Sequence, residues 1–326
     1  MLIGIILKMK SKPWNFFCIV GLGEHAKKNL IPSLLENNQI ILGIVTSKET
    51  TNFPSIKKFK SLNKAIKELP KKTMFIIASP PSAHERQIKK ILNSERDVFV
   101  EKPAFVKKSH IENIRLICEK KNLILLEGFM YKYTNLYKRF FDNWNSNIRN
   151  IKSLRLTFTI PANPINTFRE DPPVTSTYLF DIGCYIFSLL ADLKILDRNS
   201  IKNKFFKDIY LKKENHLIYI KATFNDISIS IKLGIGSSYE NSIEFLTNKK
   251  KSYKYWPFFS GRPIKKFILS KSNKENKKES FFDINGFRKM FKSTKQNLLE
   301  NQTIDFNNIL VVTSLLEKIN AKLIKS

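Results

Sequence analysis

Cysteines and long apolar runs are scarce in this sequence of 326 residues. It holds three cysteines, Cys18, Cys118 and Cys184, which are too few and too scattered for a disulfide framework or a zinc site. They fit a reducing compartment, where an isolated thiol is usually a small core residue. No apolar stretch approaches the ~20 residues that span a membrane. We therefore expect a cytoplasmic protein with no metal site and no membrane partner.

The start of the chain lacks the features of a signal peptide. Met1–Leu7 is apolar, but it is short, has no basic segment before it and no small-residue cleavage site after it. Met9 opens a second plausible start. We therefore expect residues 1–13 to be a leader or a misassigned start, without a function of their own.

Acidic residues are also scarce: 28 stand against 57 basic residues, and the net charge is +29. Such an excess is typical of nucleic-acid-binding proteins. Only ten of the basic residues are arginine and 47 are lysine, although arginine recognises phosphates and base edges best. Because the lysines accompany abundant asparagine and isoleucine along the whole chain, we favour a compositional bias, without a nucleic-acid partner, over a dedicated nucleic-acid surface. The charge would still attract anionic cofactors and substrates.

The length, with 42% hydrophobic residues, is typical of two domains. Residues 14–130 alternate short apolar strands with helices, which predicts an α/β domain with a parallel sheet covered on both faces. In residues 131–326 the strands alternate and are joined by short turns, which predicts an α+β domain with an open, mainly antiparallel sheet. The strands expected there are 154–160, 205–211, 216–224, 227–233 and 242–246. The helices expected there are 178–192, 285–299 and 305–324, and 249–280 is expected to be loop.

A glycine-rich turn follows directly after the first strand. Its residues are Gly21, Leu22, Gly23, Glu24, His25 and Ala26, and they fit the pattern G-x-G-x-x-G/A. The first glycine makes a tight turn, the second lets the backbone approach a pyrophosphate, and the small last residue lets helix and strand pack closely. An ordinary glycine turn is the alternative. The place of the motif at the head of the strand–helix series favours a dinucleotide-binding Rossmann domain over residues 14–130.

The end of the second strand bears on the choice of dinucleotide. The pattern usually continues with an acidic residue ~20 positions later, which binds the ribose 2′-hydroxyl. Thr46, Ser47 and Lys48 stand there instead. Two hydroxyls and a cation suit a 2′-phosphate, so we expect NADP in preference to NAD. That Lys48 is merely one of many lysines is the alternative.

A second candidate site is the tripeptide Glu101-Lys102-Pro103, which follows the apolar run 98–100. A lysine at the carboxyl end of a parallel strand lies in the crevice where such sheets bind ligands. The peptide bond before Pro103 can be cis, which would direct the preceding side chain into the site. A salt bridge within a loop is the alternative.

Four motifs follow one another along the chain: the turn Gly21–Ala26, the stretch Ser79–His84, the tripeptide Glu101–Pro103 and the segment Glu127–Tyr133. Their order and spacing resemble those of the Gfo/Idh/MocA oxidoreductases over nearly the whole chain. The resemblance implies an NAD(P)-dependent enzyme whose two domains join at Glu127–Tyr133. It also implies further cofactor contacts by Ser79, Pro80, His84, Glu101 and Lys102.

In the second domain, Asp181 and Tyr185 are four residues apart, which places both side chains on one face of a helix. On its own this describes an ordinary half-buried helix. In the family that the chain resembles, a D-x-G-x-H or D-x-G-x-Y motif supplies the catalytic groups on the substrate side. The tyrosine form is similar to dihydrodiol dehydrogenase, glucose–fructose oxidoreductase and sugar ketoreductases. The resemblance implies substrate contacts by Tyr131 and Arg169 as well; it is weaker at Ser188, where the family commonly has an acid.

The implied reaction moves a hydride between nicotinamide and a carbinol or ketone carbon of a sugar, cyclitol or nucleotide-sugar, while the oxygen gains or loses a proton. Tyr185 is expected to be the acid/base, since the Lys102 ammonium would favour the phenolate of a group whose free pKa is near ~10. Asp181 would orient substrate hydroxyls or Lys102. The alternative is a non-catalytic NAD(P)-binding regulator or an inactive relative on the same fold. We expect a homodimer or homotetramer that covers the open sheet.

Overall fold

The computed structural model describes residue 14 and residues 16–47, 53–161, 178–197, 210–214, 216–235, 238–271, 274–299 and 306–325. The chain divides into two compact units. Unit 1 comprises the residues up to Phe129 together with Phe287–Phe306, and unit 2 comprises Met130–Gly286 together with the residues from Asn307 onward. The chain therefore leaves unit 1 within the segment Glu127–Tyr133.

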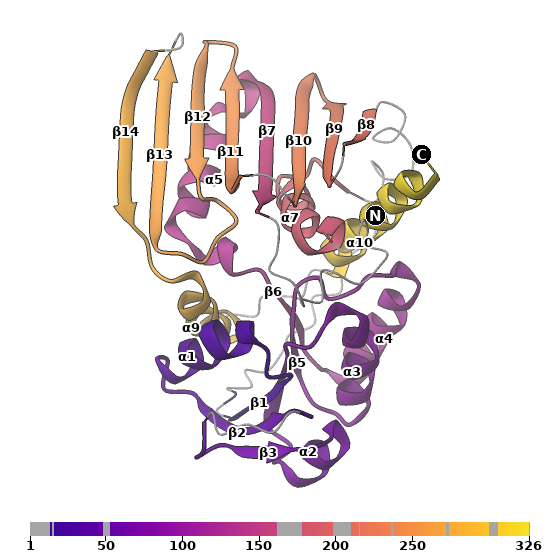
Figure 1. The fold of residues 1–326 in the computed structure, drawn as a ribbon. Helices are drawn as coiled ribbons and strands as arrows, with labels where there is room; N and C mark the ends of the chain where they lie inside the picture. The colour runs from indigo at the N-terminus through magenta and orange to yellow at the C-terminus, as the bar shows by residue number, and fades with distance from the viewer. Residues whose placement is uncertain are drawn as a thin grey trace. The chain divides into compact units, whose positions relative to one another are not determined.

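Unit 1 is built on a six-stranded sheet (Figure 1). Its strands are β1 (Phe16–Val20), β2 (Ile40–Val45), β3 (Lys57–Phe59), β4 (Thr73–Ile77), β5 (Val98–Glu101) and β6 (Leu125–Gly128). They lie in the order β3-β2-β1-β4-β5-β6, and neighbouring strands are parallel. β4 and β5 are buried along their whole length, as continuous apolar strands between two layers of helices should be. The predicted Rossmann-type sheet is confirmed.

Short helices connect these strands. They are η1 (Ala26–Leu30), α1 (Ile31–Leu35), α2 (Leu62–Glu68), α3 (Pro81–Asn93), η2 (Lys108–His110) and α4 (Ile111–Lys121). α2 begins where the Ser61 side chain accepts a hydrogen bond from the Lys64 backbone N–H. α3 begins with Pro81, which has no N–H to leave unpaired in the first turn. These residues fix where each helix starts after its strand.

α9 (Gly286–Leu299) is grouped with unit 1 from Phe287 onward. The ring of Phe287 lies edge-to-face against His25, with 5.3 Å between the ring centroids, and Phe291 lies 5.2 Å from the ring of Phe99 in β5. The expectation that every residue after 130 belongs to the second domain is therefore wrong for this helix. An amphipathic pattern predicts that a helix covers a core, but it does not say which core.

Unit 2 is built on an eight-stranded sheet (Figure 1). Its strands are β7 (Ile151–Ile160), β8 (Tyr210–Glu214), β9 (Leu217–Phe224), β10 (Ile227–Ile235), β11 (Glu240–Thr247), β12 (Lys251–Trp256), β13 (Ile264–Lys271) and β14 (Lys274–Phe282). They lie in the order β14-β13-β12-β11-β7-β10-β9-β8. Among the strands that the structure describes, β7 and β10 are the one parallel pair. The predicted mainly antiparallel sheet is confirmed; most of the strand expected over 205–211 lies outside the described residues.

The expectation that residues 249–280 form a loop is wrong, because β12, β13 and β14 run through them. Tyr253 of β12 stacks on Phe245 with 4.6 Å between the rings, and Tyr255 lies 5.2 Å from Phe267 of β13. Lys254, between the two tyrosines, points to the opposite face. Lys254 and Lys266 occupy outward positions of β12 and β13, whereas Lys265 is buried. The abundance of lysine and serine in this segment hid the period of two.

Three longer helices belong to unit 2: α5 (Asn135–Asn147), α7 (Cys184–Asp192) and α10 (Phe306–Lys325). Shorter turns are η3 (Met130–Tyr133), η4 (Ile148–Asn150) and η5 (Leu179–Gly183). α5 packs on the sheet through Phe140 and Trp144, whose rings lie 6.1 Å and 5.6 Å from Phe245 of β11. Asp283, just after β14, accepts hydrogen bonds from the first two N–H groups of α5, at 3.0 Å and 2.9 Å, and so holds the start of that helix.

No helix among the described residues is long and apolar enough to cross a membrane. All three cysteines are free thiols in the core, and burial raises the pKa of Cys18 and Cys118 to about 12. They are therefore inert packing residues.

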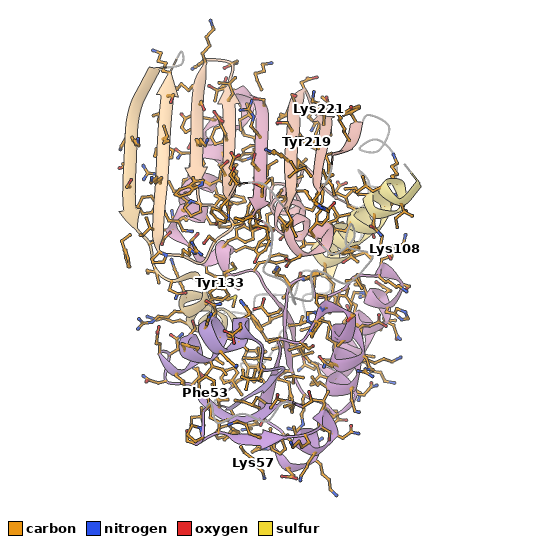
Figure 2. The ribbon with its side chains drawn as sticks, viewed as in Figure 1. Phe53, Lys57, Lys108, Tyr133, Tyr219 and Lys221 are labelled. Atoms are coloured by element: carbon orange, nitrogen blue, oxygen red, sulfur yellow. The ribbon has the colours of Figure 1, made fainter. Side chains whose placement is uncertain are left out.

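Lysine side chains are spread over the surface of both units. Figure 2 labels Lys57 on β3, Lys108 in η2 and Lys221 on β9. These three elements are far apart in the sequence and belong to two different units. Such a spread is what a compositional bias produces.

Candidate functional site

The carboxyl ends of four parallel strands bring the cofactor motifs of unit 1 to one edge of its sheet. β1 leads into the glycine turn, β2 into Thr46, β4 into Ser79, and β5 ends at Glu101. These four strands are neighbours in the sheet, and the order of connection reverses between β1 and β4. Doubly wound sheets bind their ligands at this point of reversal.

The glycine turn has the geometry that the sequence predicted. Gly21 has a φ of +99°, and a Cβ there would lie 2.9 Å from the Ser79 backbone nitrogen. Only glycine allows this approach between the loops after β1 and β4. A Cβ at Gly23 would meet nothing within 4 Å, so the backbone there faces open space. Ala26 is completely buried, as close packing of helix on strand requires.

The other side chains of the turn point to different partners. Glu24 is exposed and forms ion pairs with Lys27 and Lys28; hydrogen bonds from Lys28 first, and then Lys27, lower the pKa of its carboxyl group. His25 Nε2 lies 3.2 Å from Glu101 Oε1. Its Nδ1 lies 3.2 Å from the Asn29 amide nitrogen. Because an amide nitrogen donates, Nδ1 accepts and Nε2 carries the ring proton.

The residues after β2 give little information on the cofactor. Thr46 is buried, and its backbone N–H donates to the Phe59 carbonyl at 3.0 Å. Ser47 is exposed. Lys48 lies outside the described residues. The preference for NADP over NAD therefore has no support from this loop.

The tripeptide Glu101-Lys102-Pro103 begins at the last residue of β5. Glu101 is buried, and none of the described residues forms a hydrogen bond with its Oε1, because His25 Nε2 lies within ion-pair distance but not in hydrogen-bond geometry. Lys102 is half-buried. The Lys102–Pro103 bond is cis, as the sequence analysis allowed. A buried carboxylate oxygen without a donor is a place where a ligand hydroxyl would be stabilised.

The stretch that begins at Ser79 is engaged within unit 1. The Ser79 hydroxyl donates to Gln87 Oε1 at 2.6 Å, and Pro80 immediately precedes α3. His84 is 1% exposed, and both of its ring nitrogens face backbone carbonyl oxygens. Burial lowers the pKa of His84, and its two backbone contacts and Glu101 oppose that shift. Both ring nitrogens of His84 therefore face groups of unit 1, and the expected contact of His84 with the cofactor stays a prediction.

In unit 2, Asp181 and Tyr185 are both buried. Asp181 lies in η5, a π-helical turn, and Tyr185 lies at the start of α7. The helix expected over 178–192 is present, but residues 179–183 are π-helical. The i→i+5 bonds of that turn change the spacing on which the expected common face of Asp181 and Tyr185 was based. Short π-helical turns within helices frequently occur at functional sites. The Tyr185 hydroxyl lies 3.6 Å from the Met130 sulfur.

Tyr131, which was expected to contact the substrate, packs inside unit 2. Its side chain is fully buried, and its ring lies 5.8 Å from Tyr185 and 5.2 Å from Phe259. Its hydroxyl donates to the Tyr185 carbonyl at 3.4 Å, and burial raises its pKa well above the usual value. Tyr131 thus packs directly against Tyr185, and its expected contact with substrate stays a prediction. Arg169 lies outside the described residues.

Two residues to which the sequence analysis gave no role of their own organise these loops. Glu127 Oε1 accepts a hydrogen bond from the Ala104 N–H at 2.7 Å. In unit 2, Asp192 forms an ion pair with Lys132 at 2.8 Å and accepts a hydrogen bond from the Tyr137 hydroxyl at 2.9 Å. Glu127 could have been found from its place near the carboxyl end of a parallel strand; no local pattern marks Asp192.

The fold and the glycine turn define a two-domain protein with a dinucleotide-binding unit. Residues 17–129 match the family model described as "oxidoreductase family, NAD-binding Rossmann fold". Over these residues the match confirms the resemblance to the Gfo/Idh/MocA oxidoreductases that the motifs predicted.

Two curated proteins are similar to part of the chain. The chain is 25% identical over 175 residues to a dTDP-3,4-didehydro-2,6-dideoxy-alpha-D-glucose 3-reductase from Streptomyces antibioticus, which covers 52% of this chain and 53% of the relative. It is 25% identical over 172 residues to a protein of the same name from Actinomadura kijaniata, covering 51% of this chain and 50% of the relative. The chain thus spans about half the length of the curated relatives that it matches.

Solved structures share the fold over almost the whole chain. KijD10, a 3-ketoreductase from Actinomadura kijaniata in complex with NADP and TDP-benzene, is 16% identical and superposes with a TM-score of 0.79 over 94% of this chain and 97% of its own. A dehydrogenase from Chromobacterium violaceum is 13% identical, with a TM-score of 0.75 and 94% of both chains covered. At these identities the likeness concerns the fold alone.

Proposed function

We propose that the chain is an NADP-dependent oxidoreductase that transfers a hydride between nicotinamide and a carbinol or ketone carbon of a sugar or nucleotide-sugar. The observation that carries the proposal is the glycine turn, with Gly21 against the Ser79 loop and open space at Gly23, at the reversal point of a parallel sheet. The family match supports the dinucleotide. The names of the curated relatives, which are reductases of dTDP-linked ketosugars, support the substrate class.

The described residues of unit 1 fit such a cofactor. The open backbone at Gly23 leaves room for a diphosphate at the start of a helix. The buried Glu101 Oε1 needs a donor, and a ribose hydroxyl would supply one. The complex of KijD10 with NADP supports NADP as the first candidate. When bound, the reduced cofactor supplies a hydride.

The chain's own groups would manage the proton and the position of the substrate. Tyr185 donates a proton to the substrate oxygen in the reductive direction and removes it in the oxidative direction. Lys102 supplies a positive charge that favours the phenolate form of that tyrosine. Asp181 orients a substrate hydroxyl. Lys102 belongs to unit 1, and Asp181 and Tyr185 belong to unit 2. The kinetics of variants at these three residues therefore test whether they take part in one reaction.

The experiment is a fluorescence titration of the full chain with NADPH and with NADH, followed by turnover assays on keto-sugars and dTDP-linked ketosugars. We expect NADPH to bind more tightly than NADH and to be oxidised in the presence of at least one ketosugar. Absence of binding of either dinucleotide would exclude the proposal. Tight binding without turnover on any sugar would support a non-catalytic NADP-binding role instead.

A further inference from the structure

The peptide group between Pro103 and Ala104 is held at both of its polar atoms by side chains from other elements of unit 1. The Pro103 carbonyl oxygen lies 2.9 Å from Nδ1 of His84 in α3. The Ala104 N–H donates to Oε1 of Glu127 in β6, at 2.7 Å. This peptide group directly follows Lys102–Pro103. Two elements that are separate in the sequence therefore fix the chain next to Lys102.

The ring of His84 has two carbonyl oxygens as neighbours. Besides Nδ1 and the Pro103 oxygen, Nε2 lies 2.7 Å from the Ser79 carbonyl oxygen. A neutral imidazole carries one N–H and can donate to one carbonyl only. The charged groups that act on the ring are Glu101, which favours the protonated form, and Lys102, which opposes it. Burial is the larger influence and keeps the ring neutral near pH 7.

The contact with Glu127 strengthens one of the two acceptors. A carboxylate that accepts from the Ala104 N–H polarises that peptide group, and hydrogen bonds in such a chain strengthen one another. The Pro103 oxygen belongs to the same peptide group, so it becomes a stronger acceptor for Nδ1, although Nε2 lies closer to its own carbonyl partner. Variants that keep a donor at only one of the two ring positions show which nitrogen carries the proton.

We propose that Glu127 and His84 are positioning residues for Lys102, because together they fix the peptide group that follows the Lys102–Pro103 pair. The proposal rests on the proposed function for the role of Lys102 in turnover. Under this proposal, the Glu127–Tyr133 motif helps to position Lys102 as well as joining two domains. His84 also positions this segment and need not contact the cofactor.

Conservative variants separate this role from general stability. Glu127→Gln keeps an acceptor oxygen for the Ala104 N–H, whereas Glu127→Ala removes it. His84→Asn keeps a donor nitrogen near the place of Nδ1, whereas His84→Gln moves the donor toward Ser79. Small misplacements of a reacting group cost up to ~10²-fold in rate. We expect Glu127→Ala and His84→Gln to lower kcat at least about tenfold with the NADPH Kd within about threefold, and the other two to stay within about threefold of wild type.

A double-mutant test shows whether the effect passes through Lys102. In a Lys102→Ala background, Glu127→Ala is expected to cause no further loss of kcat. The matched controls are Glu112→Ala and His110→Asn, which change exposed ion-paired residues elsewhere in unit 1 and are expected to leave kcat unchanged. An equal loss from Glu127→Ala in both backgrounds, or full kcat in Glu127→Ala, would overturn the proposal.

Amide hydrogen exchange of the segment 101–105 tests the proposal without any turnover. We expect faster exchange in Glu127→Ala and His84→Gln, and wild-type exchange in Glu127→Gln and His84→Asn. Unchanged exchange in Glu127→Ala would refute the positioning role even if the enzyme is active. If the wild-type chain shows no turnover, the proposed function fails, and the exchange experiment still decides whether these residues hold the segment.

Discussion

Gly21 and Gly23 are two residues apart, yet only Gly21 has a backbone conformation and a close neighbour that disfavour a side chain. Gly21 has a positive φ and lies against the Ser79 backbone, whereas Gly23 has free space around it. Gly21→Ala is expected to lower the free energy of unfolding by about 1–3 kcal/mol through backbone strain. Gly23→Ala is expected to leave stability unchanged but to raise the NADPH Kd at least about tenfold, because a methyl group stands where the diphosphate approaches; tenfold corresponds to about 1.4 kcal/mol. Urea unfolding and NADPH titration of both variants measure this contrast, and wild-type affinity in Gly23→Ala would contradict it.

Lys102 and Tyr185 are the residues on which the chemistry depends. Tyr185→Phe removes the hydroxyl proton but keeps the ring, and general acid–base groups contribute ~10²–10⁴-fold to rates. We expect kcat to fall by roughly 10²-fold or more in Tyr185→Phe, and a large loss in Lys102→Ala. The NADPH Kd should change much less in both. Steady-state kinetics and cofactor titration distinguish the two effects, and full activity in either variant would remove that residue from the mechanism.

Lys265 of unit 2 is completely buried, and its ammonium donates to the Pro257 and Ser260 carbonyls at 3.0 Å and 2.6 Å. Burial lowers its pKa to about 8, against the opposing influence of Asp283. Between about pH 8 and the unfolded value near ~10.4, the unfolded chain holds a proton that the folded chain lacks. The contribution of this residue to stability therefore rises with pH across that window, and it is lost as pH falls toward 8.

Comparison with Lys265→Met isolates this effect from the other titrating groups. The free energy of unfolding of wild type minus that of the variant should be larger at pH 9.5 than at pH 7.5. Urea unfolding at the two pH values measures it. An equal difference at both values would show that Lys265 titrates normally. No sequence pattern marks this residue, because burial of one lysine among 47 depends on distant segments.

At the scale of helices and strands, the sequence predicted unit 1 well and unit 2 less completely. The strands of unit 1 are apolar on both faces, and that composition is visible locally. β12 to β14 were missed because lysine and serine are frequent in them, so the strands look polar when counted as a segment. The two π-helical turns, η1 and η5, also have no signature in the spacing of apolar residues.

Substitutions in α9 measure how much its contacts with unit 1 contribute to the free energy of unfolding. Phe291 is buried against Phe99 of β5, whereas the next residue, Lys292, is exposed. Phe291→Ala is expected to lower the free energy of unfolding by about 3 kcal/mol, through lost burial and a cavity. Lys292→Ala on the same helix is the control and should change it by less than about 0.5 kcal/mol. Equal values for the two variants, by urea unfolding, would mean that α9 does not pack on unit 1.

At the scale of the whole molecule, one row of paired residues crosses the large sheet from β9 to β14. It consists of Lys221, Ser230, Arg155, Glu244, Lys254, Ile268 and Lys278. The row holds four cations and one carboxylate, and paired residues share one face. A homodimer that covers this face would bring like charges together.

We therefore expect self-association to be weak at low salt and tighter at high salt, because salt screens exposed charges. Sedimentation equilibrium at 50 mM and 500 mM salt measures this. Lys254→Glu should strengthen association at low salt. A chain that stays monomeric under all conditions, or that associates more weakly as salt rises, would contradict the expected homodimer or homotetramer through this face.

The composition and motifs were enough to predict two domains, the class of each sheet and the loops that meet at the edge of unit 1. The composition and motifs could not show that both ring nitrogens of His84 face backbone carbonyl oxygens, because that depends on how three loops approach one another. They could not show the return of α9 to unit 1 either, since the choice between two apolar cores is not local information. Sequence patterns thus predict helices and strands better than they predict which residues these pack against.

Unit 1 is assembled from two stretches of chain, one that ends at Phe129 and one that starts at Phe287. During synthesis, which proceeds from the N-terminus at ~5–20 residues per second, the first stretch emerges from the ribosome well before the helix that covers Phe99 and His25 has been made. The nascent domain must wait for roughly 8 to 30 seconds with an apolar surface exposed. Chaperone binding to ribosome-held chains should accordingly persist until α9 has emerged.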